Sequence, residues 1–375
     1  MIGHRSVSGS AFFIPAMRTT TFILIILAAL ACKPEPERND DVAAPDHDDH
    51  PVSLHHFAEQ QKVEVFIDGA LFTEYRYALE IKKPVLFPLI AADGTILSRG
   101  YPLEPRPGEQ TDHLHHVGQW LDHGVVNEVD FWAATPEKQS TDDKTYGSVI
   151  HRKITEMSEG ETGALAYTAD WISDRGEKLL VEQTRFVFSG EDDDRIIDRI
   201  TTLEAQDEAV VYEDSKEGMM AVRVARFMEQ PYDEPQELIG TDGKPMAQKV
   251  VDNAQVKGEY LNSDGLRGDA VWGQRANWVS LAAPKEGKTY AITIMDHPSN
   301  VNYTTHWMAR GYGLFAANPL GSKVYSEGKE ELNLTLAPGE STKLTYRILL
   351  HSGEALSQEK LDSLFQPILF LSNLE

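Results

Sequence analysis

The side chains best suited to chemistry are concentrated in one stretch, TDHLHHVGQWLDHGVVNEVDFW, which spans residues 111–132. Imidazole has an ordinary pKa of about 6.5, so a histidine can take up or release a proton near neutral pH, and it can also bind a metal ion. If HLHH is extended, His113 and His115 lie on one face of the strand and His116 lies on the other. Two glycines interrupt the stretch and predict a strand, a turn and a second strand.

Two further segments carry polar side chains that a plain connection between strands would not need. In EDSKEGMMAVRVA (213–225), Glu217 precedes a predicted strand and Arg223 lies within it. The segment 295–321 follows a predicted buried strand and contains Asp296, His297, His306 and Arg310. Long polar loops often carry function, so we expect side chains from these segments to meet the histidines in one site.

The rest of the chain reads as strand after strand. KVEVFIDG (62–69) alternates apolar and polar residues and ends in Asp-Gly, which predicts a hairpin. Residues 179–190 and 194–205 alternate at the same period of two, so each predicted strand has one buried face. We therefore expect an all-β fold, an antiparallel β-sandwich. A short C-terminal helix is expected after residue 354, with Ser357 as its N-cap and Pro367 limiting its length.

The N-terminal region predicts export and a lipid anchor. The apolar run FILIILAALA (22–31) is too short to span a bilayer and is typical of a signal peptide, whose true start could be Met17. It ends at Ala-Leu-Ala-Cys32, which resembles a bacterial lipobox, and Cys32 is the sole cysteine of the chain. We expect residues 1–31 to be the signal peptide, 32–58 an acidic flexible tether and 59–375 a single β domain. The protein is then lipid-anchored through Cys32, in the outer membrane facing the periplasm or at the cell surface.

The charge of the chain excludes some partners. Of its 375 residues, 59 are acidic and 35 basic, which gives a formal charge of −24. This negative field argues against nucleic acid and against an anionic membrane surface bound through charge. No glycine-rich phosphate loop is present, so no nucleotide cofactor is implied.

The stretch 111–132 resembles the signature of the DUF6807 family, whose members are often labelled PmoA. The resemblance rests on DHLHHVG, Trp120, His123-Gly124, Asn127 and DFW, and on the later blocks DHPSN, HWMARGYGLFAANPLG and LAPGESTKLTYRILLHSG in order. It covers roughly residues 60 to 353 and implies a β-supersandwich related to galactose mutarotases, in exported bacterial proteins often linked to sugar use. Leu114 and Val117 stand where the family usually has Pro and Arg, which implies a difference in specificity if that Arg binds an anionic substrate.

The PmoA label does not fit this chain as a description of function. A methane monooxygenase subunit would need several apolar membrane spans, and the sequence holds one short apolar run. The supersandwich carries sugar epimerases, lyases and binding modules alike, so the fold does not choose among them.

The first hypothesis is a carbohydrate-active enzyme that uses acid/base chemistry at a sugar ring or glycosidic bond. The candidate acids are His116 and His297, the candidate bases Glu217 and Asp296, and the candidate charge stabilisers Arg223 and Arg310. The side chains expected to contact substrate are His113, Trp120, His123, Asp130, Arg223, His306 and Trp307. Each tryptophan, and Trp132 with them, could instead be ordinary core packing.

Three alternatives stay open. The chain could be a glycan-binding surface lipoprotein without catalysis. It could be a metal-dependent enzyme with Asp112, His113, His115 and His123 as ligands, since imidazole and carboxylate suit zinc or iron, although no HExxH motif is present. We expect no cofactor, with a divalent metal ion as the exception. The histidines could also be structural, bonded to backbone and carboxylates at strand corners, although a large buried polar set carries a desolvation cost.

Overall fold

Alternating apolar and polar residues form long strands in the computed structural model, which describes residues 50–366 and 368. These residues lie within one compact unit, His47–Glu375. The strands are β1 (Val52–Phe57), β2 (Lys62–Ile67), β3 (Ala70–Arg76), β4 (Val85–Leu89), β5 (Gln119–His123), β6 (Val129–Asp130), β7 (Thr145–Ser158), β8 (Gly163–Ser173), β9 (Lys178–Glu191), β10 (Asp194–Ala205), β11 (Val210–Tyr212), β12 (Gly218–Arg223), β13 (Glu259–Asn262), β14 (Trp278–Lys285), β15 (Lys288–Asp296), β16 (His306–Ala309), β17 (Leu314–Asn318), β18 (Leu334–Leu336) and β19 (Ser341–Gly353). The helices are α1 (Ser322–Tyr325) and α2 (Gln358–Phe365), and 3₁₀ turns lie at Ala58–Gln60, Leu79–Ile81, Arg226–Met228 and Gly268–Val271.

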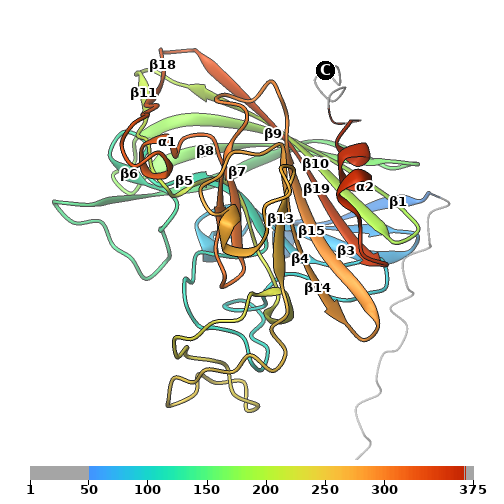
Figure 1. Cartoon of the computed structure of the whole chain (residues 1–375). Helices are drawn as coiled ribbons and strands as arrows, with labels where there is room; N and C mark the ends of the chain where they lie inside the picture. The colour runs from blue at the N-terminus through green and yellow to red at the C-terminus, as the bar shows by residue number, and fades with distance from the viewer. Residues whose placement is uncertain (1–49, 367, 369–375) are drawn as a thin grey trace, which may run out of the picture. The chain divides into compact units, whose positions relative to one another are not determined.

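Within the described residues the strands form two large sheets (Figure 1). The eight-stranded sheet has the order β1-β2-β3-β4-β5-β12-β17-β16, and the nine-stranded sheet has the order β13-β14-β15-β19-β10-β9-β8-β7-β6. A small third sheet pairs β11 with β18. All described strand pairs are antiparallel except β6 with β7, so the predicted antiparallel sandwich is confirmed.

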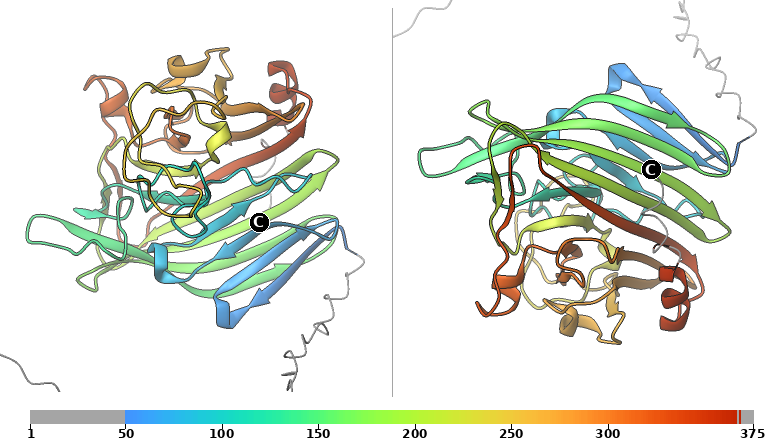
Figure 2. Two further views of the ribbon diagram at one scale, coloured as in Figure 1. Left: turned by 90° about the horizontal axis from the view of Figure 1, so that it is seen from below. Right: turned by 90° about the horizontal axis from the view of Figure 1, so that it is seen from above.

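The core lies between the two large sheets. Figure 2 shows the blue strands of one sheet lying against the green strands of the other. Aromatic rings meet across the interface: Phe72 contacts Phe188 edge-on at 6.3 Å, and Tyr75 stacks on Tyr167 at 4.7 Å. Such pairs stabilise a core beyond the area they bury.

The predicted Asp-Gly hairpin and the C-terminal helix are both present. Asp68 and Gly69 have φ of 52° and 73°, the left-handed conformations that a two-residue hairpin turn requires. They join β2 to β3, which pair antiparallel. Helix α2 begins after Ser357, whose side chain accepts a hydrogen bond from the Lys360 backbone N–H.

The boundary of the tether is different from the prediction. The signal peptide, Cys32 and residues 32–49 of the predicted tether lie outside the described residues. Residues 52–57, however, form β1 and pair with β2 from Val52 opposite Ile67 to Phe57 opposite Lys62. The sheet therefore begins before residue 59, because β1 buries Val52 and Leu54 in the core and satisfies the outer edge of β2.

The outer face of the eight-stranded sheet carries a second apolar cluster. Successive side chains of a strand point to opposite faces, so Trp120 of β5, Ala221 of β12 and Ala316 of β17 turn away from the main core. Loops cover this face and build the site described next. Among residues 50–366 and 368, no helix is long and apolar enough to cross a membrane.

Candidate functional site

The three neighbouring histidines lie in a turn, not in a strand. HLHH is not extended, so the division of its histidines between two faces does not apply: His113 has a left-handed φ of 43°, and the His116 backbone N–H donates to the His113 carbonyl at 3.0 Å. Gly118, with φ of 54°, then brings the chain onto β4, where a Cβ would meet the Leu86 carbonyl oxygen at 2.1 Å. The turn places His113, His115 and His116 together instead of on opposite faces.

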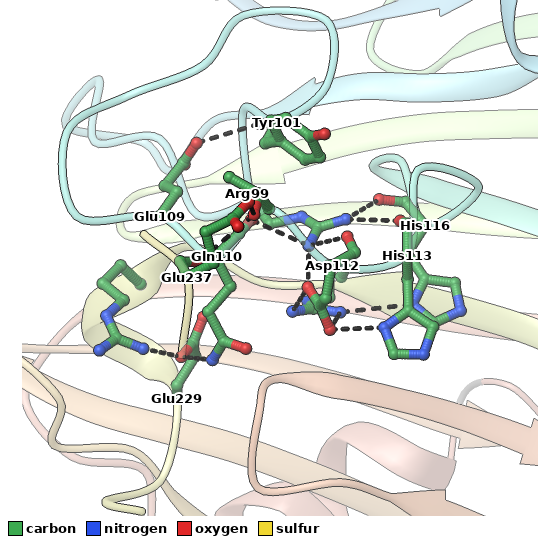
Figure 3. A network of polar contacts seen from close by, with 12 residues as sticks. Arg99, Tyr101, Glu109, Gln110, Asp112, His113, His116, Glu229 and Glu237 are labelled. Atoms are coloured by element: carbon green, nitrogen blue, oxygen red, sulfur yellow. Dashed lines mark hydrogen bonds and ion pairs between the residues drawn. The ribbon is translucent and has the colours of Figure 1, made fainter. Parts of the chain in front are cut away.

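A fully buried arginine holds this turn (Figure 3). Arg99 donates to the backbone carbonyls of Asp112 and His113, each at 2.9 Å, and to that of His116 at 3.1 Å. It also donates to the Asp112 carboxylate at 2.6 Å. Because a guanidinium offers five donors in a rigid plane, one side chain fixes the whole turn.

Asp112 joins two arginines to the first histidine. Its carboxylate accepts hydrogen bonds from Arg99, from Arg223 at 2.7 Å and from His113 Nδ1 at 2.5 Å. Burial alone would raise the pKa of Asp112, but Arg223, the His113 hydrogen bond and Arg99 hold that pKa well below its usual value. The carboxylate is therefore ionised and can only accept, so His113 donates to it from Nδ1 and its Nε2 lies outside this hydrogen bond.

His113 belongs to a stack of rings. Tyr312 lies parallel to His113 at 5.3 Å on one side, and His116 lies parallel to it at 4.6 Å on the other. His116 stacks in turn on Trp120 at 5.3 Å, and the Arg223 guanidinium lies 4.6 Å from the centre of the Tyr312 ring. The stack fixes the plane of each imidazole, while the His113 side chain keeps 41% of its surface exposed.

His116 is a neutral hydrogen-bond donor. Burial, followed by the neighbouring charges of His115 and Arg223, lowers the pKa of His116 well below its usual value. Arg223 can only donate, so its contact with His116 Nδ1 at 3.3 Å makes Nδ1 the acceptor and puts the proton on Nε2. Within the described residues Nε2 has no hydrogen-bond partner, although the residue is only 1% exposed.

These side chains line a cavity of about 250 Å³ on the outer face of the eight-stranded sheet. Its walls come from three segments far apart in the sequence, and they are His113, His115, His116, Trp132, Ala133, Lys216, Glu217, Met308, Arg310, Tyr312 and Leu314. The structure therefore brings together four of the residues selected from the sequence as catalytic or substrate-contacting: His113, His116, Glu217 and Arg310.

Two other selected residues support the cavity from below. Arg223 and Trp120 are fully buried, Arg223 under Tyr312 and Trp120 under His116. Lys83, itself buried and paired with Asp122 at 2.6 Å, lies 5.1 Å from the centre of the Trp120 ring. Trp120 thus contacts a cation and an imidazole, and it offers no free face to a sugar.

The remaining residues of the first stretch lie away from the cavity. His123 points to the opposite face of β5 from Trp120, where its Nε2 contacts the Glu213 carbonyl oxygen at 2.7 Å. Asp130 accepts from the Ala133 backbone N–H at 2.8 Å and pairs with Lys144 at 2.9 Å. It holds the loop that carries Trp132 in place.

The DHPSN segment belongs to the other sheet. Asp296 ends β15, is fully buried, and accepts from Asn300 at 2.7 Å and from the Thr305 backbone N–H at 3.1 Å. Burial raises the pKa of Asp296 to about 7 despite these hydrogen bonds. His297 Nδ1 contacts the Ser299 hydroxyl at 2.7 Å. Neither residue lines the cavity, so the structure does not place them with His113 and Glu217.

The two candidate residues of β16, His306 and Trp307, point to opposite faces of the eight-stranded sheet. His306 contacts the Gly273 carbonyl oxygen at 2.8 Å and packs against Tyr325, outside the cavity wall. Trp307 lies in the main core and donates from Nε1 to the Ala276 carbonyl at 3.0 Å. Core packing is therefore its role in this structure.

The four residues predicted as alternative metal ligands do not lie together. Among the described residues, no group of three or more His, Cys, Asp and Glu side chains is arranged to hold a metal ion. Asp112 is occupied by two arginines and His113, and His123 lies on the other face of β5 from the cavity. The proposed ligand set Asp112, His113, His115 and His123 therefore does not converge.

A larger depression of about 390 Å³ lies around the turn between β8 and β9. Most of its wall consists of exposed charged side chains, such as Glu128, Arg175 and Asp207, and it contains no aromatic ring. Ligand sites combine apolar surface with a few placed polar groups, so the smaller cavity fits that description better.

Sequence reasoning missed three residues of the site. Arg99 holds the turn, Tyr312 stacks on His113, and Lys216 lines the cavity beside Glu217. Tyr312 lies within a segment selected for its polarity, two residues after Arg310, and its aromatic ring was the available signal. Nothing in the local sequence marks Arg99, since its partners lie 11 to 17 residues further on.

Comparison with known proteins gives one family and distant structural likenesses. The profile described as "Family of unknown function (DUF6807)" matches residues 62–366. No curated protein matches the chain. The galactosidase domain of an alpha-galactosidase–sucrose kinase is similar with 8% identity and a TM-score of 0.35, over 80% of this chain and 42% of that one, so the chain spans less than half of its length. A galactose mutarotase related enzyme from Lactobacillus acidophilus is similar with 5% identity and a TM-score of 0.30, over 81% of this chain and 98% of that one.

Proposed function

Because the chain belongs to DUF6807, a family of unknown function, we propose a function from its own site: the cavity binds a single sugar ring and transfers a proton on it. The observation that carries the proposal is the meeting of an oriented histidine, a carboxylate and an arginine, His113, Glu217 and Arg310, in one small cavity. They come from three segments between which more than 90 residues intervene.

The size and the wall of the cavity favour a sugar ring. Ligand cavities usually measure about 300 to 1,000 Å³, so one of about 250 Å³ suits a small ligand better than a long chain within it. A pyranose has apolar C–H faces and a rim of hydroxyls. The partly exposed Tyr312 ring gives the wall apolar surface for a ring face, and the imidazoles and charged side chains offer partners to the hydroxyls.

The orientation of His113 suits it to proton transfer. Asp112 holds Nδ1, the stack between Tyr312 and His116 fixes the ring plane, and the exposed part of the ring lies in the cavity wall. This exchanges the roles expected from the sequence, where His116 was the acid and His113 a binding residue. With its pKa far below neutral, His116 cannot serve as an imidazolium acid, and its Nε2–H is suited to donate to a hydroxyl.

Glu217 is the second group of the proposed acid/base pair. Its carboxylate lines the cavity and is paired with Lys216 at 2.6 Å, while the Glu217 carbonyl holds the Gly124 backbone N–H at 2.7 Å. A carboxylate and an imidazole on different walls are what a proton removal followed by a proton return requires.

The test measures binding and chemistry on the full chain. Isothermal titration with a panel of monosaccharides gives binding, and NMR in D₂O gives deuterium incorporation into the bound sugar or its conversion. We expect His113→Gln and Glu217→Gln each to lower turnover about 10²- to 10⁴-fold, the usual contribution of a positioned acid or base. The matched controls His56→Gln and Glu59→Gln change exposed residues outside the cavity and should leave turnover unchanged.

The outcomes separate the candidate functions. Unchanged turnover in both His113→Gln and Glu217→Gln would refute the acid/base roles. Sugar binding without any turnover in the wild-type chain would support the glycan-binding alternative instead. Absence of binding across the panel would count against the site itself.

We also propose that the protein is exported and anchored by a lipid at Cys32, since a short apolar run precedes this single cysteine. Lys33 follows it, and we propose outer-membrane sorting on that ground. Metabolic labelling with a fatty-acid analogue should mark the wild-type chain and leave Cys32→Ser unlabelled. Equal labelling of the two, or a wild-type chain that keeps its N-terminal segment, would refute the anchor.

A further inference from the structure

We infer that the ligand of the cavity carries a negative charge beside its sugar ring, as a sugar acid does. The inference rests on the proposed function, because it names the class of sugar that the same cavity takes. It starts from one cation in the cavity wall, Arg310, and from the charges around it.

Arg310 has no acidic partner. Among the described residues no carboxylate oxygen lies within 4.0 Å of its guanidinium, which instead lies flat over Trp272 at 3.7 Å from the ring centre. Its backbone is fixed, since Arg310 N–H donates to the Leu314 carbonyl at 2.8 Å and the Arg310 carbonyl accepts from Tyr260 at 2.8 Å. A partly buried arginine held in place without a counter-ion is suited to bind an external one.

The acids near the cavity are already paired. Asp112 accepts from Arg99, Arg223 and His113, and Glu217 pairs with Lys216 at 2.6 Å. Of the side chains that line the cavity, Lys216 and Arg310 are cations and Glu217 is the one carboxylate. The wall that the structure describes therefore has an excess of one positive charge.

The layer beneath the cavity adds to this excess. Arg99 and Arg223 are both fully buried, and they share the single carboxylate of Asp112. The nearby buried carboxylates Glu109 and Glu229 are paired with Arg106 and Arg226, so these four charges add no excess of negative charge. Arg99, Arg223 and Asp112 then leave a further positive charge below the histidine turn. Low-polarity surroundings screen such a charge poorly, so its field reaches the cavity. On a chain of formal charge −24, a positive cavity is a local exception, and it focuses anions where the rest of the surface repels them.

A carboxylate matches this arrangement best. The planar fork of a guanidinium binds a carboxylate through two parallel hydrogen bonds, and His116 offers a buried N–H that has no partner within the described residues. A cavity of about 250 Å³ has room for one ring with such a substituent. A sulfate or phosphate ester on the ring shares the same chemistry, and the test below distinguishes these sources.

The test compares charged and neutral versions of the same sugar on the full chain. Isothermal titration uses D-galacturonate against D-galactose, D-glucuronate against D-glucose, and D-galactose 6-sulfate and inorganic phosphate as the other anions. We expect a uronate to bind more tightly than its neutral counterpart, with an affinity that falls as salt is raised. Arg310→Gln should weaken uronate binding about 10- to 100-fold, the usual value of a hydrogen bond to a charged group, and should weaken binding of the neutral sugar by less, so that the uronate advantage is lost.

Arg152→Gln is the matched control. Arg152 lies on β7 of the other sheet, 45% exposed and paired with Asp170 at 2.7 Å, so its loss removes the same charge from a place outside the cavity. This variant should bind every ligand as the wild type does. Circular dichroism checks that Arg310→Gln keeps the fold. If this variant does not fold, Arg310→Lys replaces it, because lysine keeps the charge but loses the planar fork of the guanidinium. We then expect a loss of at least threefold in uronate affinity.

Each outcome decides between the inference and the function it rests on. A uronate advantage that Arg310→Gln removes supports the inference. Tighter binding of the 6-sulfate than of either uronate keeps an anionic ligand and overturns the carboxylate. Equal or tighter binding of neutral sugars overturns the inference and leaves the sugar site standing. Binding of phosphate alone, or of no ligand, overturns the proposed function together with the inference.

Discussion

Replacing Asp112 by asparagine tests how the histidine turn is held. The carboxylate stands between two fully buried arginines, Arg99 and Arg223, at 2.6 and 2.7 Å. Asparagine keeps the size and one acceptor oxygen, but its other group is a donor. It removes the charge that compensates the two cations, and it leaves one of the three donors to Asp112 facing another donor.

The magnitude follows from burial. Removing one partner of a buried ion pair costs about 3 to 5 kcal/mol, because the other charge stays buried and unpaired. The Asp112 side chain itself is 25% exposed, so water can partly replace it, and we expect a loss of about 3 kcal/mol in the free energy of unfolding. The control Asp170→Asn breaks a pair with Arg152, whose side chain is 45% exposed, and should cost at most about 1 kcal/mol.

Urea unfolding at several pH values gives the measurement. The pKa of Asp112 is lowered in the folded chain, so its contribution is fully present above the unfolded value of about 3.9 and is lost as the pH falls below it. The difference between wild type and Asp112→Asn should therefore be constant from about pH 5 to 8 and shrink below about pH 4. A loss under 1 kcal/mol at pH 7, or a difference that grows in acid, would refute this account of the turn.

Two further predictions concern the ring stack and the other sheet. Tyr312→Phe keeps the ring against His113 and should bind sugar as the wild type does. Tyr312→Ala should weaken sugar binding about two- to tenfold, measured by isothermal titration. Equal sugar binding by the two variants would show that the stack is not needed. Burial raises the pKa of Asp296 to about 7, so the free energy of unfolding of the wild type should fall as the pH rises from about 4 to 7. In urea unfolding, Asp296→Asn should lack this loss. Parallel pH profiles of the two proteins would contradict the burial argument.

Local sequence signals predicted the strands well. The turn at Asp68-Gly69 needs only two adjacent residues with left-handed φ, and the alternation in β9 reports which face is buried. The single buried face expected for β10 is wrong, because its central residues 197–201 are buried on both faces. β1 was missed because VSLHHF (52–57) follows an acidic, proline-containing segment and buries only its first three residues. Its place depends on pairing with β2, which local composition does not reveal.

The site was predictable in part, since polarity drew attention to the segments that form it. The shape of the histidine turn was not, because it depends on Arg99 and on the approach of Gly118 to Leu86, both contacts made by tertiary structure. Asp296 was chosen on the same ground of polarity, yet β15 carries it into the nine-stranded sheet. Which strands share a sheet is decided by long-range pairing, so sequence proximity to β16 was misleading here.

The most direct test of the central claim is a crystal structure of the full chain with the tightest-binding sugar of the panel. The account predicts a sugar ring in the histidine cavity beside His113 and Tyr312, with its charged group on Arg310 and a hydroxyl near Glu217. Density for the sugar in the wide depression beside Glu128 and Arg175, with the histidine cavity unchanged, would contradict it.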